Sequence, residues 1–315
     1  MPFSLLCLLG DAKWKAVVRD CVAEGALTHA WVNSPDEARA AFRDQHFDVV
    51  LADLRSATDP GFNLLDFIRR QPRPTAVAVV AGEEIADGFH PLYLHGVGVI
   101  LRRSAPPSAP ALRRVFESLF DPMQSVGLER HIPQGAAIDG GSIRTLADRN
   151  RFIEQASHVL SQRAARFPSV FDLRLVFEEI ANNAILHAFR TSDGEKKYSR
   201  LSDLRQLADD EHVAVQFSVG PQWTGLSVRD NQGAFQVKEV LGKLYRQVSL
   251  QGLTDESGRG LFLSWSLADV LIACVVPGQI TEVTALFHSP SPASEKTLCM
   301  YEPLAPSREA GRAET

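Results

Sequence analysis

Short apolar segments alternate with amphipathic ones through the first 120 residues of the chain. Runs rich in Val, Leu and Ala predict five strands, at residues 4–9, 26–32, 47–54, 75–81 and 97–102, and the stretches between them, together with residues 108–120, predict helices. Ser34, with Glu37 three residues later, forms a capping box at the start of the second helix. Strands that alternate with helices predict a doubly wound parallel sheet, and five such units predict a flavodoxin-like α/β fold.

A different pattern begins at residue 169, where apolar positions recur with the period of a helix. Ser169 and Asp172 predict the start of this helix. Its apolar stripe consists of Leu173, Val176, Phe177, Ile180 and Ala184. Glu179, Asn183 and His187 follow one another at four-residue spacing, so they share one face of the helix. A carboxylate and a carboxamide are costly to bury without partners, so this face is either solvated or built to hold a polar ligand.

Two later segments favour the ligand. Residues 226–233 alternate like a strand and end in Asp230 and a turn glycine, Gly233. Residues 257–263 form a glycine-rich turn that opens another apolar helix. In order and spacing, the three segments resemble the ATP-binding domain shared by DNA gyrase, MutL and the histidine kinases, known as the Bergerat fold. The resemblance covers about residues 143–290 and implies an α/β sandwich.

The resemblance implies a chemical role for several residues. Asp230 would accept a hydrogen bond from the adenine amino group, and the carboxamide oxygen of Asn183 would bind Mg²⁺, which prefers oxygen ligands. Glycines at a helix N-terminus let backbone N–H groups approach phosphates. The remaining nucleotide-binding positions are His187, Gly233, Gly258, Arg259 and Gly260. ATP and Mg²⁺ are therefore the expected cofactors. For His187 a second interpretation stays open, that of a histidine on the helix face that is hydrogen-bonded to a neighbour.

One position discriminates within this superfamily. Histidine kinases usually carry Asn one helical turn before the Mg²⁺-binding Asn, whereas this chain has Glu179. Glu at this position resembles the anti-sigma-factor serine kinases and implies that Glu179 acts as general base on a Ser or Thr hydroxyl. The duplicated pairs at 178–179 and 182–183 allow a second register, but only Glu179 with Asn183 matches the family pattern in the residues that follow.

Two positions depart from this pattern and keep a second function open. Gln232 stands where a glycine is usual, and Glu256 stands where an arginine would contact phosphate. Both favour a non-catalytic response-regulator adaptor, in which the ATP-binding-like domain is a protein-interaction module.

Two polar stretches flank the predicted site. Residues 235–257 would form a mobile lid over the nucleotide, where Lys243 and Arg246, like Arg259 beyond it, either reach the phosphates or are simply solvated. Residues 191–211 resemble an insertion that carries a short helix around 201–207, and the sequence suggests no function for it.

Asp53 ends the third predicted strand, at the edge where the functional groups of such sheets lie. This half resembles a response-regulator receiver domain, which implies phosphorylation of Asp53 and binding of Mg²⁺ by Asp11 and Asp53. The usual second acidic residue is missing, Val80-Ala81 replaces the switch hydroxyl, and Arg102-Arg103 replaces the usual lysine. The sequence therefore leaves open a phosphorylated receiver, a pseudo-receiver used for docking or dimerisation, and a merely polar strand end.

Composition excludes several classes of protein. A chain of 315 residues with 45% hydrophobic residues and a net charge of −5 is typical of a soluble protein that does not bind nucleic acid. Its four cysteines form no CxxC pair, and the chain shows no signal peptide and no membrane-spanning run, which favours the cytoplasm. None of the nine histidines precedes an acidic residue, so a sensor histidine kinase is not expected.

These observations predict a receiver-like domain at 1–121, a linker at 122–142, an ATPase domain at 143–302 and a disordered tail at 303–315. The expected function is that of a two-component or partner-switching regulator. Its receiver-like input would control an ATP-binding domain that phosphorylates Ser or Thr of a regulatory partner, or sequesters that partner. The partner would be anti-anti-sigma-like or sigma-factor-like, with an upstream histidine kinase and a second copy of the chain as further candidates.

Overall fold

The computed structural model describes residues 3–23, 28–57, 63–82, 97–163, 168–248, 259–288 and 296–303. The chain divides after Asp121 into an N-terminal unit, Met1–Asp121, and a C-terminal unit, Pro122–Glu302. Of the predicted tail, only residue 303 belongs to the described part.

The N-terminal unit is built on a parallel sheet. Its strands are β1 (Ser4–Leu8), β2 (Thr28–Trp31), β3 (Val49–Asp53), β4 (Ala76–Ala81) and β5 (Val99–Arg102). They lie in the order β2-β1-β3-β4-β5, and every described pair within the unit is parallel. This order is that of the flavodoxin-like doubly wound fold, so the fold predicted for this half is confirmed.

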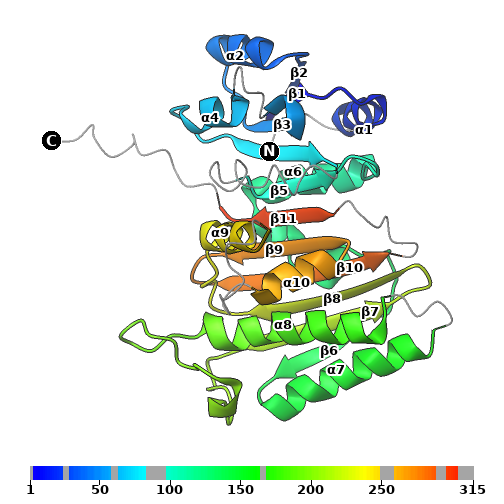
Figure 1. The fold of residues 1–315 in the computed structure, drawn as a ribbon, viewed down its shortest axis with the longest axis vertical. Helices are drawn as coiled ribbons and strands as arrows, with labels where there is room; N and C mark the ends of the chain where they lie inside the picture. The colour runs from blue at the N-terminus through cyan, green and yellow to red at the C-terminus, as the bar shows by residue number, and fades with distance from the viewer. Residues whose placement is uncertain are drawn as a thin grey trace. The chain divides into compact units, whose positions relative to one another are not determined.

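Helices cover both faces of this sheet (Figure 1). They are α1 (Ala12–Ala23), α2 (Pro35–Asp44), α3 (Leu54–Ala57), α4 (Leu64–Arg69) and α6 (Ala109–Phe120). Helix α1 packs against α6, and α2 packs against α4. The predicted cap of α2 is present, because the Ser34 side chain accepts a hydrogen bond from the Glu37 N–H.

The C-terminal unit is built on a mixed sheet. Its strands are β6 (Asp139–Ile143), β7 (Val213–Val219), β8 (Trp223–Asp230), β9 (Val270–Val276), β10 (Ile280–His288) and β11 (Thr297–Tyr301). Within this unit the order is β11-β9-β10-β8-β7-β6, with β11 parallel to β9 and all other pairs antiparallel.

Three helices of the C-terminal unit, α8 (Val170–Ala188), α9 (Val237–Val248) and α10 (Arg259–Leu267), lie over one face of this sheet (Figure 1). Helix α7 (Leu146–Ser161) packs against α8, β6 and β7. The predicted apolar stripe of α8 is buried against β8 and β10, and Ser169 caps its first turn. The result is a two-layer α/β arrangement in which α8 holds its polar face beside α9 and α10.

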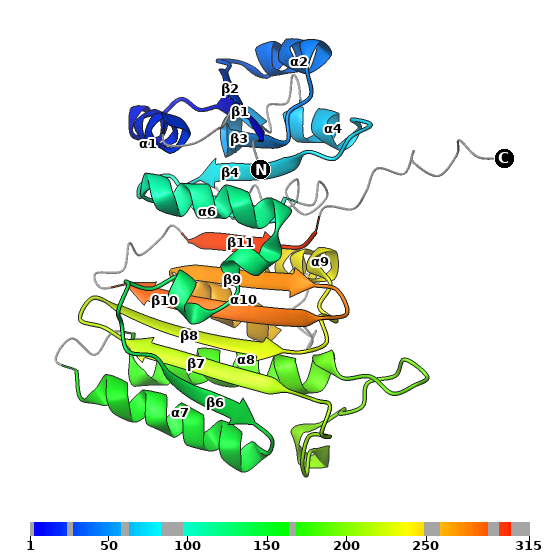
Figure 2. The ribbon, with the colours of Figure 1, turned by 180° about the vertical axis from the view of Figure 1, so that it is seen from behind.

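The segment predicted as a linker is instead part of the C-terminal unit. Two 3₁₀ helices, η1 (Pro122–Ser125) and η2 (Leu128–Arg130), pack against β9 and β8 on the face seen in Figure 2. Between them, the Gly127 N–H donates to the buried Glu282 carboxylate at 2.7 Å. Prolines and glycines suggested a linker, but contacts between residues 88 to 155 positions apart hold the segment, and local composition does not reveal such contacts.

Smaller differences concern the insertion and the cysteines. The short helix expected around 201–207 is a single 3₁₀ turn, Leu201–Asp203. All four cysteines are free and buried, as expected of inert thiols. In the described ranges, no helix has the length and apolar character needed to span a membrane.

Candidate functional site

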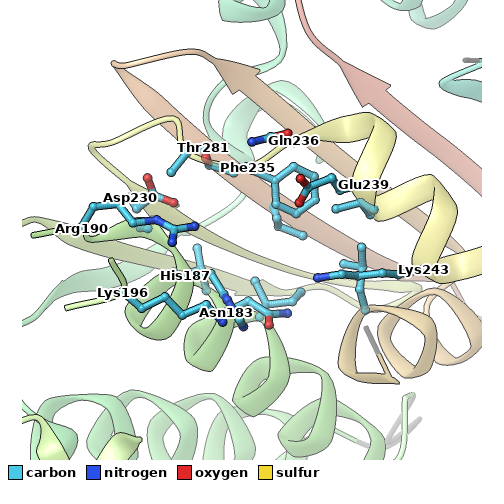
Figure 3. A pocket seen from close by; sticks show the side chains of 18 of the residues that line it. Asn183, His187, Arg190, Lys196, Asp230, Phe235, Gln236, Glu239, Lys243 and Thr281 are labelled. Atoms are coloured by element: carbon cyan, nitrogen blue, oxygen red, sulfur yellow. The ribbon is translucent and has the colours of Figure 1, made fainter. Parts of the chain in front are cut away.

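A cavity of about 180 Å³ opens in the C-terminal unit between the helices and the sheet. Apolar side chains from α8, the sheet and α10 form part of its wall, among them Ile180, Ala184, Val228, Leu261 and Val283. Polar side chains complete it, and they include Asn183, His187, Arg190, Lys196, Asp230, Glu239 and Lys243 (Figure 3). An apolar slot with few, convergent polar groups is typical of a small-molecule site.

Helix α8 supplies the central polar residues of the cavity. Asn183 and His187 both line it, because they lie one turn apart on the same helix face. The Asn183 side chain has no hydrogen-bond partner among the described residues. Asn182 is absent from the lining, and its buried Oδ1 likewise lacks a described partner. Of the two registers that the duplicated residues allow, the cavity therefore matches the one that contains Asn183.

Asp230 ends β8 at the cavity and is 4% exposed. Its Oδ1 accepts hydrogen bonds from the N–H groups of Gln232 at 2.9 Å and Gly233 at 3.2 Å. Burial raises the pKa of Asp230 to about 6, although these N–H groups oppose the shift. Gly233 has a φ of 61°, and a Cβ there would collide with the Val276 carbonyl, so the turn requires glycine.

Glu179 lies outside the cavity lining and faces α10. A Cβ added at Gly260 would collide with the Glu179 carboxylate, so the glycine lets the first turn of α10 approach this side chain closely. Burial and the neighbouring Glu178 raise the pKa of Glu179, while Arg149 on α7 opposes the shift. Arg149 is itself 9% exposed, and its guanidinium lies 3.9 Å from Glu178. A half-buried carboxylate with a raised pKa, one helical turn before the cavity-lining Asn183, suits a general base.

Three cations line the cavity without a described counter-ion. Arg190, Lys196 and Lys243 have neither an ion pair nor a side-chain hydrogen bond within the described part of the chain. Burial, followed by Lys196, Lys243 and Arg190 in turn, lowers the pKa of His187 to about 4. His187 is therefore neutral near pH 7, and the cavity can accept negative charge.

The carboxyl edge of the N-terminal sheet is arranged differently. Asp53, at the end of β3, accepts hydrogen bonds from Arg103, with Nε 3.3 Å from Oδ2 and Nη2 3.1 Å from Oδ1. Asp11, expected as a Mg²⁺ ligand, instead caps α1 by accepting from the N–H groups of Lys13 at 2.8 Å and Trp14 at 3.0 Å. Over the described residues, no three His, Cys, Asp or Glu side chains gather as a metal site.

The structure thus divides the predicted site residues into groups. Asn183, His187 and Asp230 line one cavity, Gly233 supports Asp230, and Glu179 meets Gly260 beside it. Gly258 and the side chain of Arg259 lie outside the described part, as do residues 249–257 of the predicted lid, whose start is helix α9.

Sequence reasoning did not find Arg190, Lys196, Glu239 and Thr281, which also belong to the lining. Thr281 lies directly opposite Asp230 in the β10–β8 register, which only the paired strands reveal. The basic residues 190, 196 and 197 around the start of the insertion were the one available signal for the cations.

No family model matches the chain, and no curated protein matches it. Among solved structures, the chain is similar to the chemotaxis response regulator CheY4 of Vibrio cholerae, with 16% identity and a TM-score of 0.32 over 37% of this chain and 98% of that protein. It is also similar to the receiver domain of the response regulator TorR, with 17% identity and a TM-score of 0.32 over 38% of this chain and 96% of that one. NtrX from Brucella abortus matches with 16% identity and a TM-score of 0.33, over 65% of this chain and 51% of that protein.

Proposed function

We propose that the C-terminal unit is a Bergerat-type ATP-binding domain and that the whole chain is a two-component or partner-switching regulator. The observation that carries this proposal is the convergence of Asn183, His187 and Asp230 on one cavity. The sequence resemblance assigns these residues to one nucleotide site, although the chain separates Asp230 from Asn183 by more than 40 positions.

The donor set of the cavity fits Mg²⁺-ATP. The buried Asp230 carboxylate would accept a hydrogen bond from the adenine amino group, and apolar residues such as Ile180 and Val228 would contact the flat base. The unpartnered Asn183 oxygen would hold Mg²⁺, which usually takes one or two protein oxygens beside phosphate oxygens. The three uncompensated cations favour a polyanionic ligand. The bound nucleotide supplies an activated phosphoryl group for transfer.

The position of Glu179 favours phosphate transfer over a purely structural role. Its carboxylate lies against Gly260 at the start of α10, and a helix N-terminus favours anions. A general base is most effective when its pKa lies near the working pH, and burial moves Glu179 in that direction. Glu179 would take the proton from the Ser or Thr hydroxyl of a sigma-factor-type regulatory partner. The non-catalytic adaptor is the second candidate, favoured by Gln232, which stands where a glycine is usual.

The N-terminal unit would act as the input or docking part. Its receiver-like fold presents Asp53 at the functional edge, but Arg103 holds both carboxylate oxygens and Asp11 caps a helix. This arrangement favours a pseudo-receiver that docks a partner over a phosphorylated receiver.

Isothermal calorimetry of the full chain with ATP and Mg²⁺ tests the proposal. We expect saturable binding of one ATP per chain, with higher affinity when Mg²⁺ is present. Absence of ATP binding would refute the nucleotide site, while binding without any phosphate transfer or hydrolysis would favour the adaptor.

A further inference from the structure

The polar insertion after α8 is a folded element with its own network. Residues 189–197 form a hairpin in which Arg190 bridges Lys196, and the Thr191 N–H donates to the Glu195 carbonyl at 2.9 Å. The turn includes Gly194, which has a φ of 82°. Such a turn needs a residue that tolerates the left-handed conformation, so the sequence Thr-Ser-Asp-Gly suits it.

A buried carboxylate anchors this hairpin. Glu211 is 5% exposed and accepts hydrogen bonds from the Lys197 ammonium and the Tyr198 hydroxyl, both at 2.6 Å, and from the Ala208 N–H at 2.8 Å. Tyr198 also packs edge-to-face on the buried Phe189, with ring centroids 6.1 Å apart. A buried carboxylate that is paired and hydrogen-bonded is costly to disturb, so Glu211 anchors the end of the hairpin at Lys197 and Tyr198.

The anchored hairpin presents two cations to the cavity. Lys197 points to Glu211, whereas Arg190 and Lys196 line the cavity. Figure 3 shows Lys196 and Lys243, which comes from α9, extending from opposite sides toward His187 and Asn183. The hairpin therefore closes one side of the cavity with positive charge, opposite the positive charge of α9.

The three cations repel one another in the empty site. Burial, then Lys243 and Arg190, lowers the pKa of Lys196, and Asp230 and Glu239 are the carboxylates on the same lining. Neither carboxylate lies within ion-pair distance of these three cations in the described structure. Like charges held together at a cavity mouth are relieved when an anion binds between them.

We propose that the hairpin of residues 189–197 is a phosphate-binding element, through which Arg190 and Lys196 make the affinity of the cavity depend on the number of phosphates of the nucleotide. This inference rests on the proposed ATP site and gives a function to the insertion that follows α8. Each added phosphate carries negative charge into the space between Lys196 and Lys243, so ATP binds more tightly than ADP, and ADP more tightly than AMP.

Calorimetric titrations of the full chain with ATP, ADP, AMP and inorganic tripolyphosphate test this. The test variant is Arg190→Gln with Lys196→Gln. The matched control is Arg200→Gln with Arg205→Gln, which removes the same charge from two positions that are exposed, as Arg190 and Lys196 are, but do not line the cavity. We expect the test variant to bind ATP about tenfold more weakly and AMP within about threefold of native, because a charge-assisted contact is worth roughly a factor of ten or more. The control variant should match the native protein.

The outcomes separate this inference from the ATP site itself. If the affinities for ATP and AMP fall by the same factor in the test variant, the hairpin does not bind the phosphates and the inference is wrong. The same holds if the control variant loses as much ATP affinity as the test variant. If the native protein binds no adenine nucleotide but binds tripolyphosphate through Arg190 and Lys196, the ATP site fails and the phosphate-binding hairpin stands. If the native protein binds neither, both proposals fail.

Discussion

Two groups of charged residues, one in each unit, differ in how their charge is balanced. At the carboxyl edge of the N-terminal sheet, the Asp53 carboxylate meets the Arg103 guanidinium through two hydrogen bonds, and both side chains are less than one quarter exposed. In the C-terminal cavity, Arg190, Lys196 and Lys243 have no described counter-ion, and Asp230 is buried without a cation.

This difference distinguishes a carboxylate whose charge the protein itself balances from a cavity whose cations have no described counter-ion. A paired, mostly buried carboxylate is satisfied by the protein itself, so a ligand gains little by displacing its partner. Uncompensated charge around a cavity raises the free energy of the empty protein, and a ligand of opposite charge recovers that energy. The contrast therefore favours the proposed ligand site in the C-terminal unit and a structural role for the pair at Asp53, and each prediction below can break it.

The largest expected effect is on phosphate transfer. Glu179→Gln removes the proposed base, so transfer of the γ-phosphate of ATP to the Ser or Thr of the partner should fall by about 10²–10⁴-fold in a single-turnover assay, while ATP affinity stays within about threefold. Glu178→Gln is the comparison variant. It removes the charge that raises the pKa of Glu179 and the ion pair with Arg149 but leaves the proposed base in place, so a much smaller loss is expected. Equal losses in both variants would contradict the assignment of Glu179.

The next effect concerns adenine recognition. Asp230→Asn converts part of the acceptor into a donor and should weaken ATP binding about tenfold or more, because an unpaired buried polar group costs about 1–3 kcal/mol. The ionised carboxylate is the binding form, so ATP affinity should be constant above about pH 7. It should fall about tenfold per pH unit below the pKa of about 6. Calorimetry between pH 5 and 8 checks both statements, with Asp230→Asn as the reference because the terminal phosphate of ATP also titrates near pH 6. An equally steep pH profile in the native protein and in Asp230→Asn would refute the role of this carboxylate.

A smaller effect tests the ion pair between Asp53 and Arg103 in the N-terminal unit. A double-mutant cycle with Asp53→Asn and Arg103→Gln should give a coupling free energy of about 1–2 kcal/mol in urea unfolding, because the pair is mostly buried and doubly hydrogen-bonded. The exposed pair Asp66–Arg70 is the control, with an expected coupling below about 0.5 kcal/mol.

The same pair predicts the response to phosphodonors. Incubation with a small phosphodonor and Mg²⁺ should add no more mass to the native protein than the same treatment adds to Asp53→Ala, each compared with its own untreated sample. An Asp53-dependent mass increase would show that the pair with Arg103 does not prevent phosphorylation of Asp53. The N-terminal unit would then be a phosphorylated receiver and not a pseudo-receiver.

The smallest effect distinguishes a cap from a metal ligand at Asp11. Asp11→Ala should lower the free energy of unfolding by about 1 kcal/mol, because α1 loses its N-cap, whereas Asp11→Asn keeps a capping oxygen and should change it by a few tenths at most. Urea unfolding with and without Mg²⁺ measures both. Stabilisation of the native protein by Mg²⁺ that disappears in Asp11→Asn would instead indicate metal binding.

Much of the fold could be predicted from local pattern. Alternating apolar and amphipathic segments predicted the five strands of the N-terminal unit. Four of them are largely buried and continuously apolar, whereas β2 is a more exposed edge strand. The cap at Ser169 and the apolar stripe predicted α8 correctly, since the period of a helix depends only on nearby residues. The segment 122–142 was misread as a linker, because the hydrogen bond from Gly127 to Glu282 joins residues that are 155 positions apart.

The sequence by itself determined which residues of α8 share a face, since Glu179, Asn183 and His187 are one turn apart in any α-helix. Only the tertiary structure decided that Asn183 and His187 face a cavity, while Glu179 meets Gly260. It likewise decided that Arg103 pairs with Asp53 and that Arg190 and Lys196 join Lys243 around one cavity. The physical reason is that helix period and strand alternation follow from backbone geometry, whereas charge balance depends on which distant side chains packing brings together.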